Sequence, residues 1–482
     1  MDHTPTSRRL PRTLIPLTIN FSVRYVVLTG LLERLQGHAA PVLGLSWDDP
    51  ALEADLRATG AEVVRLPDPE LPRDATSTMA LIEVDFHRRL ASPSRPIELR
   101  RRALGRPLVE RLRRRATDLR IALRLRIPGA ADRLAADLER FHDRSASFAA
   151  HEQFLRDHRI DAVVSITPYS VQEALLLPAA ARLGLRAMTS VLSFDNLTTR
   201  PPLPVAFERY LVWNAYNAAE LVRGYPELDP DRIEVVGPAQ FDFYRDPRYV
   251  EDLATWQARL GVPAGVPTIL FGAGPPVIAP HEPQYLAHLL DAIADGRLPE
   301  TTTVILRRHP HDLPERWTAF LDHPSVRHDD PGPVGTTVRP GQAAMGEAQI
   351  VGLCSTLAHT DVHVNVSSTL TLDGAFFGKP QIGPAYDVEG TRGERRRARD
   401  LYRREHFLPI VASGGLELPR SPEELVAQAA SALADPDRLA PQRRAMITAM
   451  CTYLDGRSTE RVATEVNTFL DEVGAGLAPA PA

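Results

Sequence analysis

The chain has few of the residues that define a disulfide-bonded, metal-bound or membrane-spanning protein. It contains two cysteines, Cys354 and Cys451, and a single lysine, Lys379, among 482 residues. So few cysteines exclude a disulfide framework and a cysteine-based zinc site. No apolar run reaches the length of about 18 residues that a membrane span needs, and no signal-peptide pattern follows the N-terminal arginines. We therefore expect a cytoplasmic protein whose membrane contact, if any, is peripheral to the inner face.

The bulk composition is that of an ordinary globular enzyme. Hydrophobic residues make up 44% and charged residues 24% of the chain, which is enough apolar material for two or three domains of about 100–200 residues. The net charge of -5 gives no general attraction to nucleic acid. We therefore expect no nucleic-acid partner.

The first half alternates short apolar runs with helical patterns. Strands are predicted at 13–19, 40–47, 61–67, 161–168, 185–193, 209–214 and 232–238. Helices with apolar residues three and four apart fall between several of these runs, which is typical of a doubly wound parallel sheet in an α/β fold. The Gly-X-Gly-X-X-Gly motif is missing from the first turn, so nothing indicates a dinucleotide. We place this Rossmann-like domain at 1–245.

The segment at about 86–150 interrupts that alternation. It is rich in arginine, leucine and alanine and has few strand-forming residues. Two or three helices with a basic face are predicted there. The basic face is either a solvated surface in an arginine-rich chain, or a surface that meets anionic lipid headgroups or a polyanionic acceptor.

The second half repeats the strand and helix alternation. Strands are predicted at 267–274, 302–310, 359–366 and 379–384, and helices at 282–296, 367–378, 421–436 and 441–473. We place a second Rossmann-like domain at 246–440, C-terminal helices that pack back toward the first domain at 441–473, and a disordered tail at 474–482.

Three hydroxyl residues, Ser367, Ser368 and Thr369, stand between a predicted strand and the helix that follows it. Ligands of open parallel sheets bind outside the carboxyl ends of the strands. Free backbone N–H groups at a helix start, with hydroxyls beside them, suit a diphosphate, although plain helix capping needs only one such residue. Asp373 lies one turn further on and either accepts bonds from ribose hydroxyls or balances the helix dipole.

Other polar groups follow neighbouring strands in both halves. Gly272 and Gly274 form a tight turn after one strand, and a basic group, Arg307, Arg308, His309 and His311, follows the next. Arginine can clamp a phosphate, and histidine can neutralise a leaving diphosphate or move a proton. In the first half the candidates are Asn20, Ser22, Asp195 and Asn196. Asp195 is a candidate general base for an acceptor hydroxyl; the alternative is an Asx turn.

A competing interpretation is a metal site. His359, Asp361 and His363 alternate with period two, so on a strand they would share a face. A central strand would bury such a site away from the strand ends. We therefore predict no metal.

Several segments together are similar to one superfamily of bacterial surface-polysaccharide enzymes. They are Ser193–Thr199, Leu211–Asn214, Val236–Asp242, Arg308–Pro310, Asp361–Thr369, Gly378–Pro380 and Asp455–Arg461. The chain resembles, over about 150–470, the GT-B superfamily that includes CDP-glycerol glycerophosphotransferases and UDP-N-acetylglucosamine 2-epimerases.

The resemblance implies two Rossmann-like domains facing across a cleft and a donor nucleotide held mainly by the second. It implies no cofactor and a metal-independent transfer from a UDP-, GDP-, CDP- or dTDP-sugar to a glycan or lipid-linked acceptor. His309 matches the histidine of the superfamily's Arg/His-Pro loop, and Ser368 and Thr369 match its phosphate-binding pair. Asp373 stands where relatives often carry Glu. Polyol-phosphate transfer from CDP-glycerol, or a non-catalytic binding protein, is the alternative. The epimerase branch needs additional acidic and basic catalytic residues, and we find no match for them in this sequence.

Overall fold

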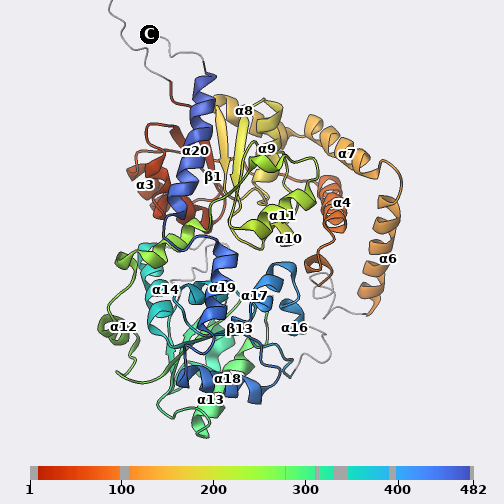
Figure 1. Cartoon of the computed structure of the whole chain (residues 1–482). Helices are drawn as coiled ribbons and strands as arrows, with labels where there is room; N and C mark the ends of the chain where they lie inside the picture. The colour runs from red at the N-terminus through yellow and green to blue at the C-terminus, as the bar shows by residue number, and fades with distance from the viewer. Residues whose placement is uncertain are drawn as a thin grey trace, which may run out of the picture. The chain divides into compact units, whose positions relative to one another are not determined.

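The computed structural model describes residues 9–97, 108–276, 278–309, 312, 314–330, 346–389 and 398–477. The chain divides into two compact units. Unit 1 comprises 1–91, 108–240 and 457–482, and unit 2 comprises 92–107 and 241–456. Each unit is built on one parallel sheet (Figure 1).

Unit 1 contains a seven-stranded sheet in the order β3-β2-β1-β4-β5-β6-β7. The strands are β1 (Arg12–Leu17), β2 (Ala40–Leu45), β3 (Glu62–Arg65), β4 (Ala162–Ser165), β5 (Arg186–Ser190), β6 (Tyr210–Val212) and β7 (Ile233–Val235). All pair in parallel. Every strand predicted in the first half is therefore confirmed. The central strands β1, β4 and β6 are buried on both faces of the sheet, which leaves an apolar run in the sequence.

Helices cover both faces of this sheet. One apolar cluster joins the sheet to α2 (Leu31–Arg34), α3 (Pro50–Ala58) and α20 (Ser458–Ala475). The other joins it to α8 (Ala146–Asp157), α9 (Glu173–Arg182) and α11 (Ala215–Gly224). Helix α20 comes from the end of the chain and lies against the strands of unit 1 (Figure 1). Its buried residues recur three and four apart, at Val462, Val466, Phe469 and Val473.

The Arg-rich segment is helical where it is described. It contributes α6 (Leu108–Leu125) and α7 (Ala130–Arg144) and is preceded by α4 (Arg73–Leu90). Helix α7 packs on α4 and α8. The start of unit 1 also holds a short helix, α1 (Asn20–Val23), and a π-helix at Arg24–Leu28.

Unit 2 contains a six-stranded sheet in the order β10-β9-β8-β11-β12-β13. The strands are β8 (Thr268–Gly272), β9 (Thr303–Arg307), β10 (Val326–His328), β11 (Val362–Asn365), β12 (Gln381–Ile382) and β13 (Leu416–Glu417). The α/β class with two doubly wound sheets is therefore confirmed. Strands β10 and β13 were not predicted, because each contains a single apolar residue and therefore shows no apolar run.

The helices of unit 2 that bear on the site are α12 (Leu253–Leu260), α13 (Glu282–Ala294), α14 (Glu347–His359), α15 (Leu370–Phe376), α17 (Leu408–Ala412), α18 (Pro422–Ala434) and α19 (Ala440–Cys451). Of the C-terminal helices expected to pack toward the first half, α20 belongs to unit 1. Helix α19 belongs to unit 2 and packs on α15 and α17. Within the described residues, no helix is long and apolar enough to cross a bilayer.

Candidate functional site

The order in which strands are added to the sheet of unit 2 reverses between β8 and β11. Strands β8, β9 and β10 run outward on one side, and β11, β12 and β13 run outward on the other. In open α/β sheets this switch point is where ligands bind, beyond the carboxyl ends of the strands. Two predicted positions lie side by side there, because Gly272 pairs with Arg307. On its other side Gly272 pairs with Asn365, which was not predicted.

The loop after β11 holds polar atoms that the described residues leave unsatisfied. The Nδ2 atom of Asn365 and the Oγ atom of Ser367 are buried and have no hydrogen-bond partner in the described part of the chain. Ser367 is also in the left-handed region, with φ of 49°, which costs a non-glycine residue free energy and is concentrated at functional sites. These atoms mark the loop as a place where a polar ligand could bind.

The same loop is fixed by its own hydrogen bonds. Asn365 Oδ1 accepts from the Ser368 N–H at 3.3 Å and from the Thr371 hydroxyl at 2.9 Å. The Ser367 N–H donates to the Tyr402 hydroxyl at 3.2 Å. Helix α15 begins only at Leu370, with an exposed Thr369 as its N-cap. The prediction that the helix begins at Ser367 was therefore wrong, because Ser367 takes a left-handed turn.

The glycine turn after β8 meets two other parts of unit 2. A Cβ added at Gly272 would lie 2.5 Å from Leu370 Cδ1, so a larger residue there would force the Leu370 side chain, at the start of α15, to move. The Gly274 N–H donates to both carboxylate oxygens of Glu282, at 3.1 and 2.9 Å. Glu282 is fully buried and paired with Arg316. Burial raises its pKa to about 8, against the lowering effects of Arg316 and the Gly274 amide.

The predicted basic group follows β9, and most of its members have acidic partners. Arg307 pairs with the buried Asp329, and Arg308 donates through Nε to Asp330 at 2.9 Å. The Nη1 atom of Arg308 is buried without a partner in the described part of the chain. His309 is half-buried, and its carbonyl accepts from the Asp312 N–H at 2.8 Å. His311 lies outside the described residues.

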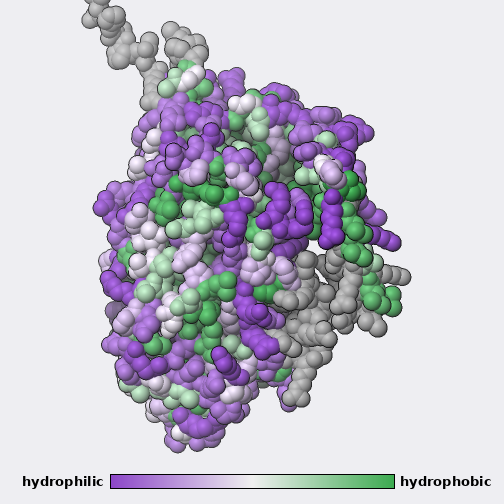
Figure 2. All heavy atoms as spheres, turned by 45° about the vertical axis from the view of Figure 1, so that its right-hand side comes forward, coloured by the Kyte–Doolittle hydropathy of each residue, from purple (hydrophilic) through white to green (hydrophobic). Residues whose placement is uncertain are grey.

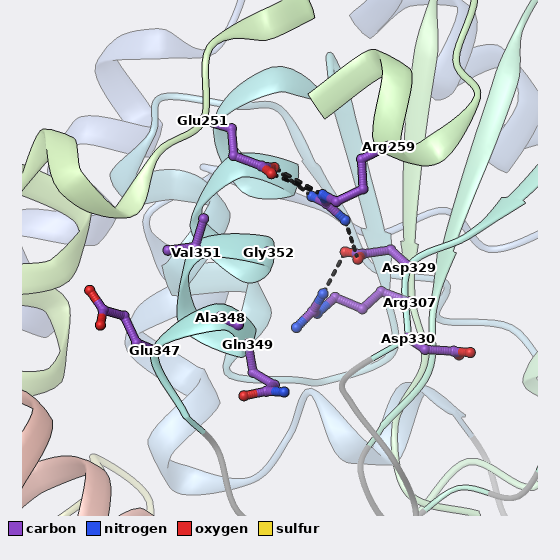
Figure 3. A pocket seen from close by; sticks show the side chains of 10 residues that line it. All are labelled: Glu251, Arg259, Arg307, Asp329, Asp330, Glu347, Ala348, Gln349, Val351 and Gly352. Carbon is purple, nitrogen blue, oxygen red and sulfur yellow. Dashed lines mark hydrogen bonds and ion pairs between the residues drawn. The ribbon is translucent and has the colours of Figure 1, made fainter. Parts of the chain in front are cut away.

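A cavity of about 480 Å³ adjoins Arg307. Figure 3 shows Glu251, Arg259, Asp329 and Arg307 as a chain of ion pairs along it. Its lining also includes Asp330, Glu347, Ala348, Gln349, Val351 and Gly352. The cavity therefore places a guanidinium and several carboxylates next to the carboxyl end of β9.

Asp373 is more enclosed than its predicted ribose-binding role requires. It is only 7% exposed, and its Oδ1 accepts from the Tyr244 hydroxyl at 2.8 Å. The two residues are 129 positions apart in the chain, so no local sequence signal could have revealed the pair.

In unit 1 the candidates lie at the corresponding sheet edge and are largely engaged in local bonds. The Ser22 hydroxyl donates to the Ile19 carbonyl at 2.5 Å and is fully buried; Asn20 is 6% exposed in the same short helix. Asn196 donates to Asp195 Oδ1 at 3.3 Å, and Asp195 Oδ2 accepts from Thr199 at 3.3 Å. Asp195 is half-buried at the start of α10 (Asn196–Thr199), where a loop was expected.

The proposed metal ligands do not share a strand face. His359 is the last residue of α14 and its Nε2 bonds to the Glu251 carbonyl at 2.7 Å. Asp361 accepts from Thr268, and His363 is buried within β11. The expected strand over 359–366 is therefore shorter, because α14 continues to His359. Within the described residues no cluster of three or more His, Cys, Asp or Glu could hold a metal.

Sequence reasoning missed a buried carboxyl group near the switch point of unit 1. Glu173 is fully buried and accepts from the hydroxyls of Thr167 at 2.7 Å, Ser170 at 3.3 Å and Ser165 at 2.5 Å. Burial raises its pKa to about 7, although the three hydroxyls act to lower it. The only sequence signal was an acidic residue in the first turn of an otherwise apolar helix.

The raised pKa of Glu173 predicts a pH dependence of stability. The folded-state pKa of Glu173, about 7, exceeds the unfolded value of 4.5. The stabilisation that Glu173 contributes is therefore fully present below pH 4.5 and is lost as pH rises through 7. The free energy of unfolding that Glu173 contributes changes by about 3 kcal/mol across this interval. We expect Glu173→Gln to flatten the change in melting temperature between pH 5 and 7.5, an interval chosen around the two pKa values. The exposed Glu227→Gln should leave the slope unchanged; an equal slope in both variants would exclude Glu173 as its cause.

The fold can be compared with solved structures now that the site geometry is described. No protein-family model and no curated protein sequence matches the chain. The UDP-GlcNAc 2-epimerase of Neisseria meningitidis bound to UDP-GlcNAc is 10% identical, with 95% of this chain and 100% of that chain covered and a TM-score of 0.54. The S. aureus MnaA–UDP structure is 12% identical, with 96% and 97% covered and a TM-score of 0.54.

The chain has the GT-B fold. A third structure agrees: the UDP-GlcNAc 2-epimerase from Methanocaldococcus jannaschii is 11% identical, with 95% and 99% covered and a TM-score of 0.51. Identities this low establish the architecture alone. The resemblance to the GT-B superfamily expected from the sequence is confirmed at the level of fold.

Proposed function

We propose that this GT-B protein is an enzyme that binds a nucleoside-diphosphate sugar at the carboxyl edge of the sheet of unit 2. It would transfer the sugar to a hydroxyl of a cell-surface glycan or lipid-linked acceptor. The observation that carries the proposal is a pair of buried polar atoms at the switch point, Asn365 Nδ2 and Ser367 Oγ, which have no partner among the described residues. Solved structures with this fold hold UDP or UDP-GlcNAc, which supports the same class of ligand here.

The loops that follow the neighbouring strands β8, β9 and β11 would form the part of the site that binds the sugar donor. Ser367, Ser368 and Thr369 would bind the diphosphate next to Gly272, where the Leu370 side chain fills the space that a Cβ would take. Arg308 Nη1, which has no partner among the described residues, could add a charged hydrogen bond. These donors are in place before the ligand arrives, so they need little reorganisation when charge develops on the leaving group.

The proposed reaction is a displacement at the anomeric carbon. The acceptor oxygen forms a bond to this carbon, and the bond from the carbon to the diphosphate oxygen breaks, leaving its electron pair on the nucleoside diphosphate. The acceptor proton passes to a general base, for which Asp195 is the proposed group in unit 1. His309 would stabilise the negative charge on the leaving diphosphate. No metal is required in this scheme.

Epimerisation of the sugar at C2 is the second candidate. It is favoured by the similarity to solved 2-epimerases over nearly the whole length of both chains. An assay without an acceptor distinguishes the two functions. An epimerase converts UDP-GlcNAc to its C2 epimer, whereas a transferase leaves the ring configuration unchanged. Polyol-phosphate transfer would instead require CDP-glycerol and release CMP.

The proposed donor site predicts nucleotide-dependent stabilisation. We expect one of UDP, GDP, CDP or dTDP to raise the melting temperature, since a ligand at about 100 times its Kd stabilises the folded state by about 2.7 kcal/mol. Ser367→Ala should remove most of this shift, because the unpartnered hydroxyl is lost. Ser325→Ala is the matched control, because Ser325 is also half-buried but precedes β10 at the amino edge of the same sheet.

Differential scanning fluorimetry with and without each nucleotide measures the effect. A cooperative melt that no nucleotide shifts would contradict the donor site itself. A shift that survives Ser367→Ala would leave nucleotide binding in place but move it away from this loop.

A further inference from the structure

Helix α6 exposes a continuous apolar stripe instead of burying it. The exposed fractions are 60% for Val109, 55% for Leu112, 62% for Leu119, 54% for Leu123 and 53% for Ile127, just beyond the helix. With Ala116, which lies between Leu112 and Leu119, these positions recur every three or four residues. They therefore lie along one side of the helix. Figure 2 shows the exposed hydrophobic residues along α6.

The stripe is not the side by which α6 attaches to unit 1. Leu125 is 6% exposed and lies about 160° around the helix from Val109 at about 100° per residue. Helix α6 packs against α7. An amphipathic helix normally turns its apolar side to the core. In α6, Leu125 faces the core, whereas the apolar stripe faces outward.

Arginine flanks this stripe on both sides. The sequence of α6 contains six arginines and two acidic residues, Glu110 and Asp118. At about 100° per residue, Arg120 lies at one border of the stripe and Arg126 at the other, and both are exposed. Glu110 lies about 100° around the helix from Val109, away from the stripe. The helix therefore combines an outward apolar side with basic borders.

We propose that α6 binds the surface of an anionic lipid bilayer, with its apolar stripe inserted at the boundary of headgroups and acyl chains. Leucines on one side and arginines at its borders are the features that hold a helix in the plane of a membrane interface. The positive borders complement acidic headgroups. A second copy of the helix would bring arginines against arginines, and nucleic acid would leave the leucines unburied.

Vesicle binding of the full chain tests this assignment. We expect the protein to co-sediment with phosphatidylcholine vesicles that contain phosphatidylglycerol, and to bind vesicles of pure phosphatidylcholine at least tenfold more weakly. Added salt should release it, because the headgroup attraction is screened. The triple variant Leu112→Gln, Leu119→Gln, Leu123→Gln should bind the anionic vesicles at least tenfold more weakly than the wild type.

A matched control has the same three changes at exposed leucines of unit 2. Leu253, Leu321 and Leu408 are 49%, 45% and 46% exposed, and their replacement by Gln should leave vesicle binding unchanged. A probe at the stripe adds a local readout. Both native cysteines are buried, so Leu119→Cys can be labelled selectively with an environment-sensitive dye, whose emission should shift to the blue on anionic vesicles.

Two results would overturn the proposal. One is the absence of binding to anionic vesicles at low salt by a protein that melts cooperatively. The other is undiminished binding by the α6 triple variant. If the wild type proves dimeric by sedimentation velocity, the triple variant monomeric, and neither binds vesicles, the stripe is a protein interface.

Discussion

Gly374→Ala should destabilise unit 2 by about 3–5 kcal/mol, a loss composed of overpacking and of buried hydrogen bonds left unmade. Gly374 lies in α15, against β11 and β12. A Cβ at this position would lie 2.1 Å from His363 Nδ1 and 2.3 Å from Gln381 Nε2. Both side chains are almost fully buried, so neither can move to solvent.

The two crowded side chains are also held in place by hydrogen bonds. Gln381 Nε2 donates to His363 Nδ1 at 3.2 Å and to the Lys379 carbonyl at 3.0 Å. His363 Nε2 bonds to Thr360 at 2.9 Å. Burial, with a smaller effect of Lys379, lowers the pKa of His363 to about 3, so the ring is neutral and both nitrogens depend on these partners. An added methyl group would break at least one of the bonds.

Gly352→Ala is the matched control for this prediction. Gly352 also lies inside a helix of unit 2, α14, but its nearest neighbour to an added Cβ is Asp329 Oδ1 at 4.0 Å. With that space, alanine should stabilise by about 0.4–1 kcal/mol through lower unfolded-state entropy. Urea denaturation followed by fluorescence of the buried Trp256 and Trp317 measures both variants. Shifts of equal size and sign would show that the predicted crowding is absent.

The strand framework was predictable because each long strand is a buried apolar run. Strands β1, β8 and β9 are buried along almost their whole length, and burial on both faces leaves an uninterrupted hydrophobic pattern in the sequence. Strands β10 and β13 lacked such a pattern because each contains a single apolar residue. Two doubly wound sheets were likewise predictable, since the chain has two alternating halves of similar size. The GT-B architecture was expected from the resemblance of several segments to that superfamily.

The details of the site depended on contacts that no local pattern contains. The end of α14 at His359 and the left-handed Ser367 lie on either side of β11, which pairs with β8 and β12 from distant parts of the chain. The Tyr244–Asp373 bond, the Glu282 carboxylate on the Gly274 amide and the ion pairs of Arg307 and Arg308 join residues from different elements. Asn365 could have been noticed as a polar residue that ends an apolar strand just before the hydroxyl group.

His309→Ala should lower kcat by about 10²–10³-fold, the range expected when one preorganised donor to a developing negative charge is removed. The residue follows the carboxyl end of β9, and its carbonyl is fixed by the Asp312 N–H. Asp312 is itself fully buried and bonded to Arg316 and to the Trp317 indole. The imidazole is therefore carried by a loop whose backbone is anchored in the core of unit 2.

The expected signature is a split between turnover and binding. If His309 acts on the leaving diphosphate, its loss should change kcat far more than the nucleotide-induced thermal shift, because the charge it stabilises develops during the reaction. The matched control is His323→Ala, since His323 is also half-buried but lies before β10 at the amino edge of the sheet. Turnover should be measured as release of the nucleoside diphosphate that stabilises the wild type. Equal losses of turnover and nucleotide binding in His309→Ala would assign His309 to ground-state binding instead. If both histidine variants turned over like the wild type, the β9 loop would have no role in the chemistry.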